Sequence, residues 1–210
     1  MPAVAGVVLA AGGSSRLGRP KQLLDLGGEP VLRVTIRNAL ASKLRPVVVV
    51  LGYEWERVAA SIGDLGHETV VNADYGEGQS TSVWAGLGAL PPECDAVVFL
   101  LGDQPEVGAP IIDRVVAAYL ATGAPIVQAT YGGVPANPVL FDRSLFTELQ
   151  SVTGDEGGRG VVRRHAADAH RVSVSDGRPP ADIDTEADYR ALVARWRKLR
   201  DHPVEAEAFE

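Results

Sequence analysis

A glycine-rich segment with two cations follows the first apolar run of the chain. Val4–Ala10 is apolar, Gly12 and Gly13 come next, and Arg16 and Lys21 follow shortly after. Glycines let the backbone turn with its N–H groups exposed, an arrangement that binds anions. Arginine holds phosphate oxygens with paired donors, and lysine adds a compact charge. The segment predicts binding of a phosphorylated ligand such as a nucleotide; a solvated glycine turn is the alternative.

This loop matches neither of the two common phosphate-binding motifs. In a P-loop, Gly-Lys is followed by Ser or Thr, whereas Gly18 is followed here by Arg19 and Pro20. The dinucleotide fingerprint Gly-x-Gly-x-x-Gly is also missing from residues 12–18. A nicotinamide cofactor therefore has no sequence motif in its favour.

An acidic residue follows another apolar run. Asp103 comes two residues after Ala96–Leu101. Mg²⁺ takes one or two carboxylates together with phosphates and water, so an acid beside a phosphate loop suits a magnesium ligand. The alternative is a turn residue, because Asp103-Gln104-Pro105 is also a turn sequence.

Several acids surround Thr185 near the end of the chain. Thr185 and Asp188 have a spacing that resembles a helix capping box. Capping leaves Asp182 and Asp184 unexplained. Asp184 could complete the metal site from the far end of the sequence, and a metal ligand and a plain loop residue are equally consistent with the pattern there.

Two other polar regions could contact a ligand. Gln79 and Ser80 lie at a hydroxyl-rich helix start, which either caps that helix or contacts a nucleotide base or ribose. Gly132–Pro138 is rich in turn residues and predicts a loop that forms a wall of the substrate site, with Asn137 as its polar side chain. Thr153–Gly160 is a second loop of this kind. Solvated loop residues are the alternative for both loops.

Apolar runs alternate with helical patterns along the chain, which predicts a single α/β domain over residues 1–200. A mostly parallel central sheet with helices on both faces is expected, and ligands bind such sheets beyond the C-terminal ends of the strands. Residues 201–210 are acidic and weakly patterned and predict a flexible tail. The expected strands are Val4–Ala10, Pro46–Leu51, Glu68–Val71, Ala96–Leu101, Pro125–Thr130 and Arg171–Val174. The expected helices are Val31–Leu40, Glu54–Ile62, Ser80–Leu90, Ile111–Leu120, Ser144–Leu149, Gly160–Ala166 and Glu186–Leu199.

Composition narrows the function class. The chain has 210 residues, a net charge of −7 and 46% hydrophobic residues. The charge argues against a nucleic-acid partner. No tract approaches the length of a membrane span, and no signal-peptide pattern is seen, so a cytoplasmic protein is expected. Cys94 is the one cysteine, and the histidines lack the spacing of zinc ligands.

Taken together, these segments resemble the molybdenum-cofactor nucleotidyltransferases over about residues 4–195. Residues 9–24 look like the N-terminal signature of that family, and Ala10-Ala11-Gly12 looks like its cytidylyltransferase branch, whereas the guanylyltransferase branch tends to carry Ala-Gly-Gly. The segments at 77–82, 101–105 and 182–185, and Gly154-Asp155 with Arg159, are also similar to the cytidylyl branch. One departure is Ala136-Asn137-Pro138, where the branch often has Gly-His-Pro.

The resemblance implies a Rossmann-like, GT-A-like nucleotidyltransferase fold and transfer of CMP from CTP to molybdopterin, with Mg²⁺ as cofactor. Catalytic roles are implied for Lys21, Arg16 and Asp103, metal binding for Asp103 and Asp184, and acceptor binding for Gln104 and Asn137. A molybdenum hydroxylase is a candidate partner. Nucleotide-binding roles fall on Leu9, Ala10, Ala11, Gly12, Gly13, Ser14, Ser15, Lys21, Gln79, Ser80 and Gly102.

Other activities stay open at this level. The same chemistry could use GTP or another phosphorylated acceptor, such as a sugar or polyol phosphate. Relatives of this shape also include accessory proteins of molybdenum hydroxylases and oxidoreductases of small heterocycles. A carrier predicts pterin binding without nucleotide turnover, and a reductase predicts oxidation of a nicotinamide cofactor.

Overall fold

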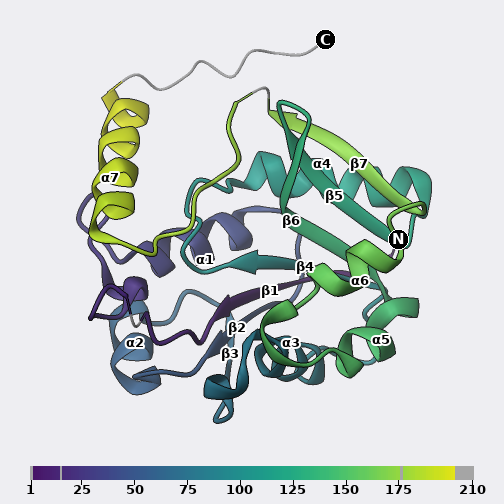
Figure 1. The fold of residues 1–210 in the computed structure, drawn as a ribbon, viewed down its shortest axis with the longest axis horizontal. Coiled ribbons are helices and arrows are strands. Elements are labelled where there is room, and N and C mark those ends of the chain that lie inside the picture. The colour runs from purple at the N-terminus through teal and green to yellow at the C-terminus, as the bar shows by residue number, and fades with distance from the viewer. Residues whose placement is uncertain (1, 15, 176, 202–210) are drawn as a thin grey trace.

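The computed structural model describes residues 2–14, 16–175 and 177–201, and within these residues one seven-stranded sheet forms the centre of the molecule (Figure 1). The strand order is β3-β2-β1-β4-β6-β5-β7. β6 runs antiparallel to its neighbours β4 and β5, and the other strand pairs are parallel. The strands are β1 Val4–Ala10, β2 Val47–Leu51, β3 Glu68–Val71, β4 Ala96–Leu101, β5 Ile126–Tyr131, β6 Val134–Asp142 and β7 Ala169–Ser175.

Helices cover both faces of the sheet, as the alternating pattern predicts. The helices are α1 Val31–Ala41, α2 Trp55–Ile62, α3 Gln79–Gly88, α4 Ala109–Thr122, α5 Phe146–Ser151, α6 Arg159–Arg164 and α7 Glu186–Asp201. Apolar side chains of α1, α2 and α4 share one core with the sheet, and those of α3 and α6 share the other. Successive strand residues point to opposite faces, so Val7 belongs to one core and Val8 to the other. Strands buried on both faces require the continuous aliphatic runs seen at β1, β2 and β4.

A third apolar cluster joins the two ends of the described chain. Leu24, Leu26 and Val31 pack with Ile183 and with Leu192 of α7. In Figure 1, α7 lies on the side of the sheet where the chain leaves β1. This packing brings the acidic segment at 182–184 next to the loop that follows β1.

The prediction of a loop at 132–138 is wrong. β6 begins at Val134 and pairs with β5 from Tyr131 onward, so the turn consists of Gly132 and Gly133 alone. Both glycines have positive φ, as a two-residue hairpin turn requires. Pro135 and Pro138 made the segment look unlike a strand, because proline is rare inside sheets.

The expected strands Val4–Ala10, Glu68–Val71 and Ala96–Leu101 match the observed ones, and the other boundaries differ by at most a few residues. Thr185 caps α7 as predicted: its hydroxyl oxygen accepts from Asp188 N at 3.2 Å, and the Asp188 carboxylate accepts from Thr185 N at 2.8 Å. Of the predicted tail, Asp201 is the last residue of α7, and 202–210 lie outside the described residues. Among the described residues, no helix combines the length and apolar character needed to cross a membrane.

Candidate active site

A cavity of about 830 Å³ opens at the C-terminal ends of β1 and β4, where ligands bind in open α/β sheets. Most of the predicted site residues line it, although they come from distant parts of the sequence. Its floor contains apolar side chains of the sheet, among them Phe99 and Phe141, whose rings meet edge to face. The predicted residues that line the cavity are Leu9, Ala10, Ala11, Gly12, Lys21, Gln79, Gly102, Asp103, Gln104 and Asn137.

The remaining predicted residues lie elsewhere. Ser15 lies outside the described residues. Gly13, Ser14, Arg16 and Asp184 are not among the described residues that line the cavity, although Arg16 and Asp184 contact each other beside Lys21. Ser80 is buried in α3 and does not belong to the described lining, whereas Gln79 and Ser82 do. Residues three apart share one face of a helix, so this face of α3 is carried by positions 79 and 82 rather than 80.

Cations of the N-terminal loop pair with the predicted metal ligands. Lys21 Nζ lies 2.5 Å from Asp103 Oδ2 and 3.9 Å from Asp184 Oδ1. Arg16 Nη1 lies 2.9 Å from Asp184 Oδ2. The Asp103 side chain is 7% exposed, and its carboxylate also accepts from Ile183 N at 3.2 Å. The fold therefore gathers at one point the charges that the sequence predicts for phosphate and metal binding.

The sequence explains how these groups meet. Asp103 follows β4, a strand that its aliphatic side chains hold in the sheet. Lys21 follows the loop that leaves the adjacent strand β1. Ile183 is 1% exposed in the third apolar cluster, so its neighbours Asp182 and Asp184 are held beside the loop. The buried side chain of Ile183 thus anchors the segment, and the acidic residues on either side of it are positioned by that packing.

Asp103 and Asp184 suit a hard cation by their donor chemistry. Mg²⁺ is usually held by one or two carboxylates, with substrate phosphates and water supplying the other ligands. Both carboxylates approach the same ammonium group, that of Lys21, Asp103 at 2.5 Å and Asp184 at 3.9 Å. Among the described residues, no group of three or more His, Cys, Asp or Glu side chains forms a ready metal cage. Two carboxylates alone would need phosphate and water oxygens to complete the coordination of Mg²⁺.

A chain of polar side chains forms the opposite wall of the cavity. Gln104 donates to Asp182 at 2.7 Å, and Asn137 donates to the Gln104 side-chain oxygen at 3.3 Å. The phenol of Tyr131 donates to the Asn137 carbonyl at 2.9 Å. Burial raises the pKa of the Asp182 carboxyl, and the nearby Asp103 carboxylate raises that pKa further. Burial also raises the pKa of the Tyr131 phenol to about 12, so this phenol stays a donor at neutral pH.

Asn137 reaches this wall from a strand rather than from the predicted loop. Ala136 pairs with Ala129 of β5, and Val139 pairs with Gln128, so residues 137 and 138 bulge out of the ladder. A bulge redirects a side chain at the edge of a site. Asn137 and Gln104, for which the resemblance implies acceptor binding, are thus hydrogen-bonded to each other in one wall. The strand that carries Asn137 was not predicted.

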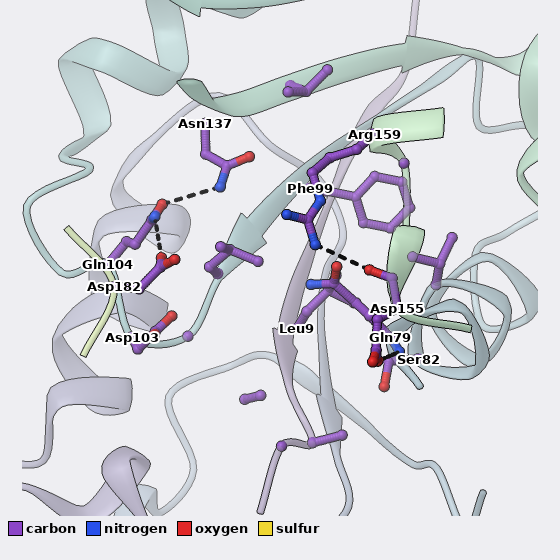
Figure 2. A pocket seen from close by; sticks show the side chains of 18 of the residues that line it. Leu9, Gln79, Ser82, Phe99, Asp103, Gln104, Asn137, Asp155, Arg159 and Asp182 are labelled. Atoms are coloured by element: carbon purple, nitrogen blue, oxygen red, sulfur yellow. Dashed lines mark hydrogen bonds between the residues drawn. The ribbon is translucent and has the colours of Figure 1, made fainter. Parts of the chain in front are cut away.

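Residues of the Thr153–Gly160 segment close the other side of the cavity. Asp155 accepts from the backbone N of Gln79 at 3.3 Å, and Arg159 donates to the Asp155 carbonyl at 3.0 Å. Figure 2 shows Gln79, Ser82, Asp155 and Arg159 on one side, and Gln104, Asn137 and Asp182 on the other. A Cβ on Gly78 would lie 2.5 Å from Gly154, so the loop and the start of α3 pack backbone to backbone.

Several lining residues were not assigned a role from the sequence. Asp182 and Arg159 are cavity residues, as are Ser82 and Gln22. The signal for Asp182 was present, because capping did not explain it. The signal for Arg159 was its place in a glycine-rich segment that is also typical of ligand-contacting loops. Gln22 has no signal of its own beyond its position after Lys21.

The chain matches known proteins over most of its length. A family model described as a MobA-like NTP transferase domain matches residues 6–170. The nicotine blue oxidoreductase of Paenarthrobacter nicotinovorans is 31% identical over 202 residues, which cover 91% of this chain and 98% of the relative. The molybdenum cofactor cytidylyltransferase of Escherichia coli strain K12 is 26% identical over 200 residues, covering 95% of this chain and 100% of the relative.

A solved structure has the same fold at 30% sequence identity. It is the manganese complex of Rv0371c from Mycobacterium tuberculosis H37Rv, with a TM-score of 0.80 over 91% of this chain and 98% of that one. The family model alone covers well over half of the residues of the chain. The chain belongs to the MobA-like NTP transferase family and is a nucleotidyltransferase.

Proposed function

We propose that the protein transfers CMP from CTP to a molybdopterin-type phosphorylated acceptor and releases pyrophosphate, with Mg²⁺ as the metal. The observation that carries this proposal is the contact between Lys21 of the glycine-rich loop and Asp103 at the edge of a cavity of about 830 Å³. Small-molecule sites span about 300–1,000 Å³, so this one is large enough for extended ligands. The name of the Escherichia coli relative supplies the cytidylyl group and the acceptor.

The chemistry needs no protein nucleophile. The terminal phosphate of the acceptor attacks the α-phosphorus of CTP in line, and pyrophosphate leaves. A phosphate monoester has a second pKa of about 6, so it is largely dianionic near neutral pH and requires no strong base. Catalysis then consists of positioning and charge stabilisation.

Each wall of the cavity has a role in this proposal. Lys21 and Arg16 balance charge on the nucleotide phosphates, and N–H groups of the loop hold the pyrophosphate. Asp103 with Asp184 would hold Mg²⁺, which when bound offsets phosphate charge; manganese in the Rv0371c structure supports a divalent ion. Ala10-Ala11-Gly12 and Gln79 face the base and ribose, and Gln104 and Asn137 face the acceptor. A cytoplasmic location and a molybdenum hydroxylase as the user of the product complete the proposal.

Pyrophosphate release tests this function. Purified protein, Mg²⁺ and CTP are mixed with purified molybdopterin or with a sugar phosphate, and pyrophosphate is measured. Release that depends on molybdopterin supports the proposal. Release with the sugar phosphate alone would move the acceptor to another class, and binding of molybdopterin without any release would indicate a carrier.

A second candidate is reduction of a small heterocycle, because a relative named as an oxidoreductase is 31% identical over 91% of this chain. The sequence lacks the dinucleotide fingerprint, which weighs against it. Oxidation of NADH or NADPH in the presence of a heterocyclic acceptor separates the two activities. A CMP transferase would show no acceptor-dependent oxidation.

A further inference from the structure

Gln22 braces the loop that follows β1. It lies in the short helical turn Lys21–Leu23 and is 2% exposed. Its side-chain amide Nε2 donates to the carbonyl of Ala10 at 2.8 Å and to that of Gly12 at 2.9 Å. One side chain therefore holds two carbonyls of the segment that the sequence assigns to nucleotide binding.

Holding a carbonyl also fixes the direction of an N–H group. In a planar trans peptide, C=O and the following N–H point in opposite directions. The bonds to Ala10 and Gly12 thus orient the N–H groups of Ala11 and Gly13 away from the Gln22 amide. The intervening carbonyl of Ala11 accepts from Tyr53 N at 3.0 Å. Three successive carbonyls are anchored to the protein, which leaves the loop little freedom to rotate its peptide units.

The other half of the Gln22 amide has no evident structural use. Its side-chain oxygen is buried and has no hydrogen-bond partner among the described residues. A buried acceptor without a partner costs stability, so packing alone does not account for this side chain. Gln22 lines the cavity. A Cβ on Gly12 would meet no atom within 4 Å, so a ligand has room to approach this backbone closely.

We propose that Gln22 is a positioning residue that orients the peptide N–H groups of the loop toward nucleotide phosphates before the nucleotide binds. Donors that are already aligned stabilise developing charge without reorganising. The inference rests on the proposed function for the identity of the ligand, but it concerns binding of a phosphate group and is independent of the acceptor.

Two substitutions separate this role from packing. Gln22→Met keeps the length and bulk without the amide donors. Gln22→Glu keeps the shape but removes both amide N–H donors: an ionised carboxylate donates nothing, and a protonated one has a single O–H, which cannot hold both carbonyls. Gln150→Met, at an exposed position in α5, is the matched control. Calorimetry measures binding of CTP with Mg²⁺ and of pyrophosphate with Mg²⁺, and a thermal melt without ligand reports folding.

The expected result is at least a ~10-fold loss of affinity for both ligands in both Gln22 variants, with the control unchanged and the acceptor KM of the parent retained. Parental affinity in folded Gln22→Met or in folded Gln22→Glu would overturn the inference. If Gln22→Met does not fold, Gln22→Glu decides alone. If the Gln22 variants bind pyrophosphate more weakly but the parent protein transfers no nucleotide, the inference stands and the proposed function is rejected. If Gln22→Met transfers CMP normally, the proposed function stands and the inference is rejected.

Discussion

Lys21 Nζ and Asp103 Oδ2 lie 2.5 Å apart, and this ion pair ties the loop after β1 to the end of β4. The Lys21 side chain is 22% exposed and that of Asp103 is 7% exposed, so both charges are largely removed from water. In the proposed reaction Lys21 faces phosphate and Asp103 faces the metal. The pair therefore keeps two groups of opposite charge compensated until their ligands arrive.

Replacing Lys21 by Met should lower turnover by at least ~10²-fold, the scale seen when one preorganised donor to developing charge is lost. The protein should still fold, with its free energy of unfolding lower by about 1–3 kcal/mol because the Asp103 carboxylate loses its partner. Steady-state CMP transfer and denaturant unfolding measure the two effects. Lys43→Met, at an exposed turn after α1, is the control. Near-normal turnover in folded Lys21→Met would remove this lysine from the mechanism.

Asp103→Asn should abolish magnesium-dependent turnover more than it weakens binding of free CTP. The carboxylate charge holds the metal, whereas backbone N–H groups of the loop still hold phosphate. Turnover is titrated with Mg²⁺ in the parent, in Asp103→Asn and in the exposed control Asp168→Asn. Superimposable titrations of the parent and Asp103→Asn would make Asp103 a turn residue only.

Asn137→Ala should raise the KM for the acceptor or lower turnover while the affinity for CTP stays close to that of the parent. The change removes the donor to Gln104 and frees one end of the Gln104–Asp182 contact. KM values are measured separately for CTP and acceptor, with exposed Gln150→Ala as the control. Loss of CTP affinity instead would assign Asn137 to the nucleotide or metal side.

The raised pKa of Asp182 predicts how stability changes with pH. Its folded-state pKa lies above its ordinary value of 3.8, so its stabilising effect is complete below that pH and is lost as pH rises through the folded value. Asp182→Asn removes this ionisation beside Asp103 and keeps a group that can contact Gln104. The Tm of the variant relative to the parent should therefore increase from pH 4 to pH 7. A Tm difference that is constant with pH would contradict the assigned shift.

The sequence predicts the sheet and its helices well because most strands are buried on both faces. Val4–Ala10 and Ala96–Leu101 match the observed strands β1 and β4 residue for residue, and both strands are almost entirely buried. β6 was missed because its prolines and the preceding glycines have the composition of a loop, and only pairing with β4 and β5 makes the segment a strand. That pairing is a long-range property that local composition does not contain.

The candidate site also divides into residues that local sequence indicates and residues that only long-range packing brings together. The loop, Lys21 and Asp103 are predictable because each adjoins an apolar strand, and parallel strands place such residues at one edge of the sheet. Whether Ser80 or Ser82 lines the cavity depends on how α3 is rotated about its axis. The Asp182–Gln104 contact depends on the packing of Ile183 against Leu24 and Leu26, which no local pattern specifies.

Identification of the transferred nucleotide tests the central claim most directly. The protein is incubated with Mg²⁺, purified molybdopterin and each of CTP, GTP and ATP in turn, and the modified acceptor is weighed by mass spectrometry. The expected product carries CMP, with CTP clearly preferred over GTP and ATP. Stronger turnover with GTP would contradict the cytidylyl assignment while leaving the family membership intact, and no transfer with any of the three would contradict the proposed activity itself.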